Sequence, residues 1–358
     1  MLTVGIVLDT LSLISMKTIL FCNLPYAFSI LKPLADELEA RRDEYLWYVD
    51  TSIVDSFPYS DEPITTSIKE LEEFCSDAIF VCGNDVPYWL CGLKVQVFHG
   101  LAGEKKGHFR IRDYFDLYLT QGAYFTERFV ELSKKYKNFE VIETGWCKLD
   151  KLYSISNKTV AKKEELLKFY DAKQIILYAP TFSPSLSSAL ELENVIEKLS
   201  NQEDILVIIK FHDKMKYEWI EIYKKMKNVL IIEDDDISES LQMADVMISD
   251  SSSVVYEFIL LDKPVITLNS TSENIDWCDV NSADEVYSSA IEVLEGKDNY
   301  ISNRQKTIAL YHPYSDGKSA KRMIEATRKH IEKHGVPLSR KVSLLRKYKM
   351  LKTYAKKS

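Results

Sequence analysis

The sequence predicts an α/β protein made of two doubly wound domains with mostly parallel sheets. Short apolar runs alternate with longer segments of helical spacing, and the alternation occurs in both halves of the chain. Strands that alternate with helices form parallel sheets covered on both faces. A length of 358 residues is also too great for one small core. We therefore expect two Rossmann-like domains that face each other across a cleft, where such folds bind ligands.

The first half contains six apolar runs with the length of strands and two segments with the period of a helix. The strands are expected at 18–22, 45–49, 78–82, 95–98, 116–120 and 140–143, and the helices at 28–41 and 124–136. Residues 154–159 are polar and weakly patterned. We place the domain boundary there, so that the N-terminal domain comprises residues 1–155.

The second half repeats the alternation more cleanly, over a domain of residues 156–334. Strands are expected at 175–178, 205–209, 229–232, 245–249 and 264–268, and helices near 188–200, 215–226, 237–243, 253–261, 284–295 and 318–334. No short-period repeat interrupts this order.

The charge of the chain is distributed unevenly. Residues 335–358 hold eight basic residues and no acidic one, so the net charge of −8 leaves −16 on residues 1–334. An acidic body argues against nucleic-acid binding. In the tail, Leu344, Tyr348, Leu351 and Ala355 form a narrow apolar stripe at helical spacing. The pattern favours an interfacial helix on anionic lipid, and the alternative is a solvated or disordered basic end.

The six cysteines show no CxxC pair and no histidine partner at zinc spacing, so no metal site is expected. In a chain of this size they are expected to be free, buried thiols of a reducing compartment. No run of 18 apolar residues is present, and the apolar start lacks the basic leader of a signal peptide. These features favour a cytoplasmic location.

One strand end has the features of an anion site. An apolar run that ends in Asp250 is followed by three serines and then by a helix-spaced segment. The first N–H groups of a helix lack partners and favour negative charge, so Ser252 and Ser253 are candidates for binding phosphate. Glu257 lies one turn further on, where a carboxylate can accept hydrogen bonds from a ribose diol. The alternative is a plain helix cap with a solvated Glu257.

Two other strands end in a histidine. His99, followed by Gly100, ends a strand of the first half, and His212 follows Lys210 in the second. A histidine in this position can act as a base near neutral pH, and glycine lets a phosphate approach the backbone. Thr181 ends a third strand at the same level. The alternatives are a structural histidine on a loop and, for Thr181, a plain turn. The segment from His312 to Lys318 is interpreted as a turn before a helix, where Ser315 or Asp316 is as plausibly a cap as a ligand.

Seven short motifs stand in the order and spacing of one enzyme family. They are Phe98-His99-Gly100, Gly145-Trp146-Cys147-Lys148-Leu149-Asp150, Tyr178-Ala179-Pro180-Thr181, Lys210-Phe211-His212, Asp250-Ser251-Ser252-Ser253, Leu261-Asp262-Lys263-Pro264 and Asp316-Gly317-Lys318-Ser319. Through these motifs the chain, from about residue 94 to 330, resembles the CDP-glycerol glycerophosphotransferases of teichoic-acid and capsule synthesis, which have the GT-B fold.

The resemblance implies transfer of glycerol phosphate, or a related polyol phosphate, from CDP-glycerol or another CDP-alcohol to a hydroxyl of a lipid-linked saccharide or polymer, with release of CMP. The first domain then takes the acceptor and the second binds the donor. His99 is implied as the catalytic base, and His212 as the contact to the donor pyrophosphate. The implied donor-binding residues are Gly100, Lys148, Thr181, Lys210, Ser252, Ser253 and Glu257. Phe98, Cys147 and Lys148 differ from the residues usual in the family, which leaves the CDP-alcohol open.

The implied chemistry needs no cofactor. A neutral His99 can take the proton of the acceptor hydroxyl, and His212, Lys210 and the helix start after Asp250 can stabilise the leaving CMP without a metal. The basic tail is expected to hold the enzyme at the inner face of the cell membrane, beside its acceptor. Two alternatives stay open: a GT-B glycosyltransferase or UDP-sugar epimerase, and a nucleotide-binding scaffold without catalysis.

Overall fold

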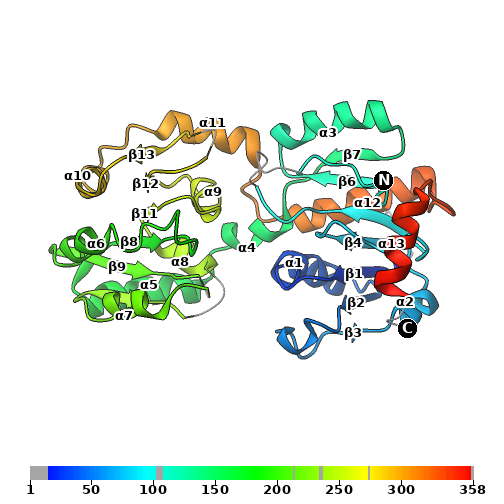
Figure 1. The fold of residues 1–358 in the computed structure, drawn as a ribbon, viewed down its shortest axis with the longest axis horizontal. Coiled ribbons are helices and arrows are strands. Elements are labelled where there is room, and N and C mark those ends of the chain that lie inside the picture. Colours follow the sequence, from blue (N-terminus) through cyan, green and yellow to red (C-terminus); the bar gives the residue numbers. More distant parts are fainter. Residues whose placement is uncertain (1–14, 102–107, 213, 234–236, 273–274, 356–358) are drawn as a thin grey trace, which may run out of the picture. The chain divides into compact units, whose positions relative to one another are not determined.

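The computed structural model describes residues 15–101, 108–212, 214–233, 237–272 and 275–355 (Figure 1). These residues form two parallel sheets with helices between the strands, so the expected α/β fold class is confirmed. The chain divides into two compact units. Unit 1 contains the chain up to Gln96, Arg112–Leu117 and the residues from Ile324 onward, and unit 2 contains Val97–Ile111 and Tyr118–Met323.

The first sheet has seven strands in the order β3-β2-β1-β4-β5-β6-β7. Their bounds are β1 Thr18–Cys22, β2 Tyr45–Val49, β3 Ile64–Thr65, β4 Ala78–Val81, β5 Leu93–Gln96, β6 Leu117–Thr120 and β7 Glu140–Glu143. Phe21 of β1 pairs in register with Tyr48 of β2 and with Val81 of β4, both parallel. Strand β1 is buried over its whole length, as expected for a central parallel strand.

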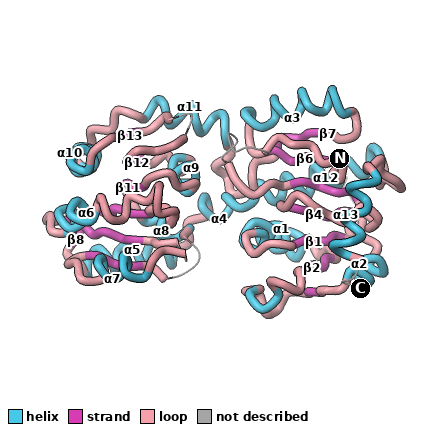
Figure 2. Tube along the Cα trace, viewed as in Figure 1, coloured by secondary structure: helices cyan, strands magenta, loops and turns pink. Residues whose placement is uncertain are grey.

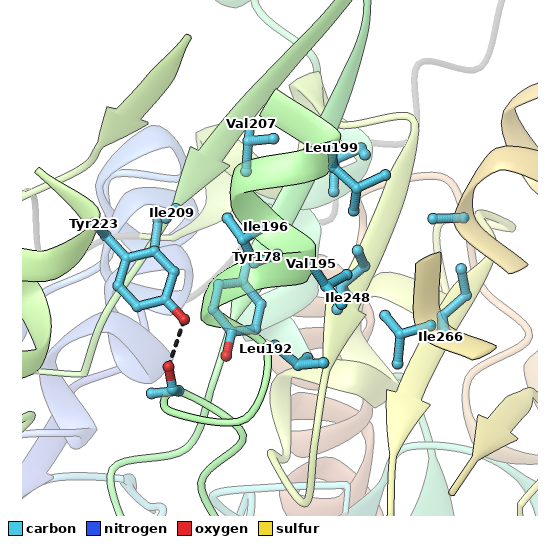
Figure 3. Packing of buried hydrophobic residues seen from close by; sticks show 14 of the residues in the cluster. Tyr178, Leu192, Val195, Ile196, Leu199, Val207, Ile209, Tyr223, Ile248 and Ile266 are labelled. Atoms are coloured by element: carbon cyan, nitrogen blue, oxygen red, sulfur yellow. Dashed lines mark hydrogen bonds between the residues drawn. The ribbon is translucent and has the colours of Figure 1, made fainter. Parts of the chain in front are cut away.

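The second sheet has six strands in the order β10-β9-β8-β11-β12-β13. Their bounds are β8 Ala172–Ala179, β9 Asp204–Ile209, β10 Val229–Ile231, β11 Val246–Ser249, β12 Val265–Leu268 and β13 Cys278–Val280. Tyr178 on β8, Ile209 on β9 and Ile248 on β11 pack with Ile196 of a neighbouring helix in one apolar cluster (Figure 3). In this cluster the Tyr223 hydroxyl donates to the carbonyl of Ala189 at 2.5 Å.

Helices follow most strands, as Figure 2 shows by colour. Their bounds are α1 Ala27–Ala40, α2 Ile68–Phe74, α3 Ala123–Tyr136, α4 Asp150–Tyr153, α5 Asn157–Phe169, α6 Glu193–Ser200, α7 Tyr217–Tyr223, α8 Ser238–Met243, α9 Val254–Ile259, α10 Ala283–Leu294, α11 Ile301–Tyr311, α12 Ser319–His334 and α13 Leu344–Tyr354, with 3₁₀ turns η1 at Val54–Ser56 and η2 at Cys147–Leu149. Helix α1 buries Ile30, Leu31, Leu34 and Leu38, as its spacing predicts.

Helices α5 and α11 are absent from the sequence-based expectation. Thr159 is the buried residue of α5, so this helix carries little apolar periodicity. The inward residues of α11 are Arg304, Thr307 and Tyr311, two of them polar. Arg304 is 4% exposed and pairs with Asp262 and Asp298 at 3.0 and 2.8 Å. A helix that turns polar side chains inward cannot be recognised from hydrophobic spacing. The expected boundary at residues 155 and 156 stays a prediction.

The cysteine expectation is partly wrong. All six cysteines lie in the described ranges as thiols, but Cys75 and Cys91 are exposed. Cys75 ends α2 in the left-handed region, with φ of 46°. A residue that terminates a helix at the surface has no core to enter. Of the helices formed by the described residues, none has the length and apolar character to cross a bilayer.

The basic tail packs on unit 1, with its last three residues, 356–358, outside the described ranges. The α13 side chains of Met350 and Tyr354 are buried, and Tyr354 contacts Phe21 and Tyr48 at ring distances of 5.7 and 6.5 Å. Arg340 pairs with Asp116 at 2.5 Å, and Arg346 pairs with Asp113. Much of the tail is therefore docked and not a solvated chain end.

The predicted apolar stripe of the tail is the outer face of α13. Leu344 is 85% exposed, Tyr348 66% and Leu351 43%, and the neighbouring Leu345 is 80% exposed. The helix thus has two apolar faces, and spacing alone cannot tell which of them packs on the protein.

Candidate functional site

The carboxyl end of β11 is organised by a buried acid. Asp250 follows the strand directly and is 1% exposed. One carboxylate oxygen accepts the N–H of Thr181 at 2.9 Å, and the other accepts the N–H and hydroxyl of Ser188, each at 2.9 Å. Burial raises the pKa of this carboxyl, and the hydrogen bonds oppose that rise. Asp250 therefore fixes the segment after β8 that carries Thr181. Sequence reasoning took Asp250 only as the end of a strand.

The three serines after Asp250 have different surroundings. Ser251 Oγ accepts the N–H of Thr271 at 3.0 Å and lies 3.0 Å from the Thr271 hydroxyl. Ser252 is partly buried and Ser253 is exposed. Ser253 is the N-cap residue of α9, but its side chain makes no capping hydrogen bond. The simple capping alternative is therefore wrong for Ser253.

Two predicted donor-binding residues meet in unit 2. Lys148 Nζ donates to Glu257 Oε1 at 2.5 Å, although 109 residues separate them in the chain. The Glu257 side chain is 13% exposed and that of Lys148 is 28% exposed. Lys148 Nζ also lies 5.4 Å from the centre of the Trp146 ring. Glu257 is thus a largely buried, paired carboxylate, and the solvated-face alternative is wrong.

The turn that carries Lys148 is held by a later part of the chain. The backbone N–H of Trp146 donates to His312 Nε2 at 2.9 Å. At the other end of the turn, the Asp150 carboxylate accepts the N–H groups of Ser319 and Ala320, at 2.8 and 2.7 Å, where α12 begins. Asp150 caps α12 from outside that helix, a role that sequence reasoning left between Ser315 and Asp316. We call residues 145–150 the lysine turn.

His312 is a buried, neutral imidazole. It is 1% exposed, and burial, with a smaller contribution from Arg322, lowers its pKa to about 4. Its ring stacks on Tyr153 at 5.8 Å. Sequence reasoning interpreted this residue as part of a turn. The signal that identifies its role is the long-range bond to Trp146, which no local pattern contains.

The second predicted histidine lies after β9. Lys210 is partly buried and donates to the carbonyl of Phe211 at 3.2 Å, and His212 is exposed. His212 Nδ1 accepts the N–H of Lys214 at 3.2 Å, which leaves Nε2 as the outer nitrogen. The His212 ring lies 4.3 Å from the ring of Phe182, the residue after Thr181. The structure therefore brings His212 next to the segment that Asp250 holds.

The first predicted histidine also follows a strand closely. His99 is exposed and comes after Phe98, a buried residue with a φ of 62°. The carbonyl of Gly100 accepts a hydrogen bond from Gln121 Nε2 at 3.2 Å. The backbone bend at Phe98 turns the chain as the strand ends. The expected placement of His99 opposite His212 stays a prediction.

The side chains of the candidate donor site in unit 2 comprise two ammonium groups, one exposed imidazole, three hydroxyls and one carboxylate. Cations and hydrogen-bond donors suit phosphate oxygens, and a carboxylate suits a diol. Serine hydroxyls and ammonium groups bind anions by charge and hydrogen bonding. The arrangement fits a nucleotide with a pyrophosphate.

A family comparison agrees with this chemistry. The model of the CDP-Glycerol:Poly(glycerophosphate) glycerophosphotransferase family matches residues 92–274, just over half of the chain. The matched region includes both histidines, Lys148, the serines and Glu257.

Individual relatives have related names. A teichoic acid poly(glycerol phosphate) polymerase of Bacillus spizizenii is 26% identical over 275 residues, 66% of this chain and 68% of the relative. A teichoic acid glycerol-phosphate primase of Bacillus subtilis is 27% identical over 42% of this chain and 38% of its own length. A teichoic acid ribitol-phosphate polymerase of Staphylococcus aureus is 25% identical over 52% of this chain and 37% of its own length. The chain thus spans two thirds of one relative and less than two fifths of the others.

Solved structures share the fold. The wall teichoic acid polymerase TagF matches with a TM-score of 0.63 at 13% identity, over 89% of both chains. A putative UDP-N-acetylglucosamine 2-epimerase of Listeria monocytogenes matches with a TM-score of 0.65 at 15% identity, over 91% of this chain and 99% of the other. At these identities the likeness supports the GT-B-like architecture alone.

Proposed function

The chain belongs to the CDP-glycerol:poly(glycerophosphate) glycerophosphotransferase family of enzymes, and from this premise we propose that it transfers a polyol phosphate from a CDP-alcohol in teichoic-acid synthesis. CDP-glycerol is the first candidate donor, since the family description names it and one TagF structure comes from a crystal soaked with CDPG. The proposed acceptor is a hydroxyl of a lipid-linked saccharide or polymer, and the second product is CMP.

The observation that carries the proposal is the pair formed by Lys148 and Glu257, at 2.5 Å, in the family-matched region. A largely buried carboxylate with a lysine beside it offers an acceptor for a ribose diol next to a cation for phosphate. In the proposed complex Glu257 accepts from the ribose hydroxyls, and the Lys148 ammonium turns to a phosphate oxygen. Ser252 and Ser253 add hydroxyl donors, and the side chain of Ser253 is not committed to a helix cap.

The proposed reaction is a displacement at the β-phosphorus of the CDP-alcohol. His99 takes the proton from the acceptor hydroxyl as its oxygen bonds to phosphorus. The bond between the β-phosphorus and the bridging oxygen breaks, and CMP leaves with the electron pair. His212 and Lys210 stabilise the charge that develops on the leaving group. Gly100 is proposed to contact the donor through its backbone, next to His99. Thr181 is proposed to contact it through its hydroxyl, because its backbone N–H already donates to Asp250.

The tail is proposed to place the enzyme on the inner face of the cell membrane. The outer face of α13 presents Leu344, Leu345, Tyr348 and Leu351, and exposed Lys341 and Lys352 flank it. Apolar side chains with basic neighbours adsorb to anionic lipid, with each basic residue contributing about 1 kcal/mol. Arg340 and Arg346 are paired with acids of unit 1, so fewer than the eight charges of the tail are available.

A product assay tests the reaction. Purified protein is incubated with a panel of CDP-glycerol, CDP-ribitol and UDP-sugars, with and without a lipid-linked acceptor, and the products are measured by mass spectrometry. We expect CMP and a phosphoglycerol-extended acceptor. Release of UDP, or epimerisation of a UDP-sugar, would instead establish the glycosyltransferase or epimerase alternative. Binding of CDP-glycerol without turnover would establish the scaffold alternative.

Matched variants test the roles. His99→Ala should lower turnover by about 10² to 10⁴ and leave donor binding nearly unchanged.

Ser252→Ala combined with Ser253→Ala should weaken donor affinity by roughly 1–3 kcal/mol. Glu257→Gln should weaken binding of CDP more than of 2′,3′-dideoxy-CDP, and equal calorimetric losses for both ligands would exclude the ribose role.

A further inference from the structure

The segment from His312 to Ala320 holds the lysine turn at both of its ends. His312 accepts the N–H of Trp146, and the first N–H groups of α12 donate to Asp150. These bonds join residues that lie 166 to 170 positions apart in the chain. Lys148 is carried between the two attachments, on η2. The direction of its side chain therefore depends on a segment to which the proposed reaction gives no role.

The protonation of His312 follows from its hydrogen bond. Since Nε2 accepts the N–H of Trp146, Nε2 carries no proton and the ring proton is on Nδ1. Burial keeps the ring neutral. A charged imidazolium would offer two donors and no acceptor, and the bond to Trp146 would be lost. His312 is thus used as a fixed acceptor and not as a proton donor or base.

The packing around Gly145 makes the attachment rigid. Gly145 has a φ of 82°, which favours glycine, and a Cβ atom there would lie 2.5 Å from Ser319 Oγ and 3.0 Å from His312 Nε2. Tyr314 closes the same region, and its hydroxyl donates to Glu143 at 3.0 Å. The start of the lysine turn therefore rests directly on the segment that follows α11.

We propose that His312 is a positioning residue of the donor site, which fixes the lysine turn through Trp146 and thereby aims Lys148 at Glu257. This inference rests on the proposed function, because only that function makes the pair of Lys148 and Glu257 a nucleotide-binding site. Without His312 Nε2 as hydrogen-bond acceptor, the lysine turn can move. Lys148 then adopts less often the position in which it binds the CDP-alcohol. The effect is expected on donor affinity more than on the chemical step.

A matched pair of substitutions tests the acceptor. In His312→Gln the amide oxygen is three bonds from Cβ, as is Nε2 of histidine, so it can still accept the Trp146 N–H. In His312→Asn the side-chain oxygen ends one bond earlier and cannot reach. Both replacements are neutral and polar. We expect His312→Asn to raise the KM for CDP-glycerol and the Kd for CDP about tenfold with a smaller change in kcat, and His312→Gln to stay near wild type.

A double-mutant cycle separates positioning from general support. Lys148→Met removes the group that His312 is proposed to aim. If His312 acts through Lys148, adding His312→Asn to Lys148→Met should cause little further loss of CDP affinity. Additive losses in the cycle would overturn the inference, since they indicate that His312 supports the site by another route.

A measurement without nucleotide distinguishes this inference from the proposed function. The reactivity of Lys148 toward an acetylating ester is followed by mass spectrometry, with the exposed Lys173 as the internal reference. Lys148 should react faster in Glu257→Gln and in His312→Asn than in wild type or His312→Gln. If the wild-type protein binds no cytidine nucleotide, the proposed function is wrong. The acetylation rate of Lys148 still tests in that case whether His312 positions this lysine. If Lys148 reactivity is unchanged in a folded His312→Asn, or if it rises in His312→Gln, the inference is wrong.

Discussion

Asp150 and Asp250 are two buried carboxylates that do the same work on different parts of unit 2. Asp150 accepts two backbone N–H groups at the start of α12, and Asp250 accepts two backbone N–H groups and one hydroxyl in the segment after β8. Burial raises the pKa of both. Each stands close in sequence to residues that are proposed to bind the donor.

Asp150 and Asp250 differ in the segments of the chain that they connect. Asp150 joins the lysine turn to a helix that begins far along the chain, so it positions a cation. Asp250 joins two neighbouring strand ends, so it positions Thr181 and, through Phe182, the surroundings of His212. Acids in such motifs therefore need not touch a ligand. They can be the scaffold on which the ligand-binding residues stand.

The largest expected effect is that of removing Asp250. In Asp250→Ala, the two buried donors of Ser188 and the partly buried N–H of Thr181 lose their acceptor, and we expect the free energy of unfolding to fall by about 3–5 kcal/mol. For a unit of this size the melting temperature should drop by roughly 10 °C. Thermal unfolding checks this, with Asp250→Asn as the control that keeps one oxygen. A loss below 1 kcal/mol would show that water replaces the carboxylate.

Removal of Asp150 should cost less stability but disturb the site more specifically. Asp150→Ala removes the acceptor for two N–H groups at the end of a helix, and we expect a loss of about 2–3 kcal/mol. Acetylation of Lys148 should become faster, because one end of the lysine turn is freed. Asp250→Ala, compared at a temperature where both variants are folded, should leave Lys148 reactivity unchanged. Equal acetylation rates of Lys148 in Asp150→Ala and Asp250→Ala would contradict the different roles proposed for the two acids.

A third acid, Asp316, should respond to pH in the opposite sense to Asp250. Burial raises the pKa of Asp250 above its usual 3.8, so the part of its contribution that depends on the bound proton is complete below pH 3.8 and is lost as the pH rises through the folded-state pKa. The hydrogen bonds that the carboxylate accepts from Thr181 and Ser188 do not depend on that proton. The hydrogen bond from Arg322 lowers the pKa of Asp316, so its contribution is present above 3.8 and is lost as the pH falls. Urea unfolding between about pH 3 and 7 should give Asp250→Asn and Asp316→Asn pH slopes that differ from wild type with opposite signs. Slopes of one sign would contradict this assignment.

The smallest expected effect concerns the serines beside Asp250. Ser251 bonds to Thr271, so Ser251→Ala should lower the free energy of unfolding by about 0.5–1.5 kcal/mol. Ser253→Ala should change it by less than about 0.5 kcal/mol, because the side chain makes no capping bond. For CDP affinity, measured by calorimetry, Ser253→Ala should cause the larger loss and Ser251→Ala the smaller one. A larger stability loss at Ser253 would indicate a capping role in solution.

The sequence predicts the elements of this fold well where one face is apolar. The strands around β8, β9 and β11 and the inward face of α1 follow from hydrophobic spacing. The motifs also indicate Lys148 and Glu257 as candidate site residues, and the structure pairs these two side chains. Sequence reasoning fails for α11, whose inward residues include Arg304 and Thr307. It also fails for His312 and for the cap that Asp150 gives to α12, because these bonds join distant segments and leave no local period. Hydrophobic periodicity does not predict hydrogen bonds between polar residues that lie far apart in the sequence.

The two-faced helix α13 has a consequence for how quickly a surface could capture the protein. Met350 and Tyr354 anchor the helix on unit 1 while its leucines point outward. A segment that must fold as it adsorbs loses much of its interaction energy to ordering of the backbone. Here the helix is formed beforehand, so nearly all the free energy of covering Leu344, Leu345 and Tyr348 is available for adhesion. If the tail binds lipid as proposed, it can therefore adsorb to a bilayer without a folding step.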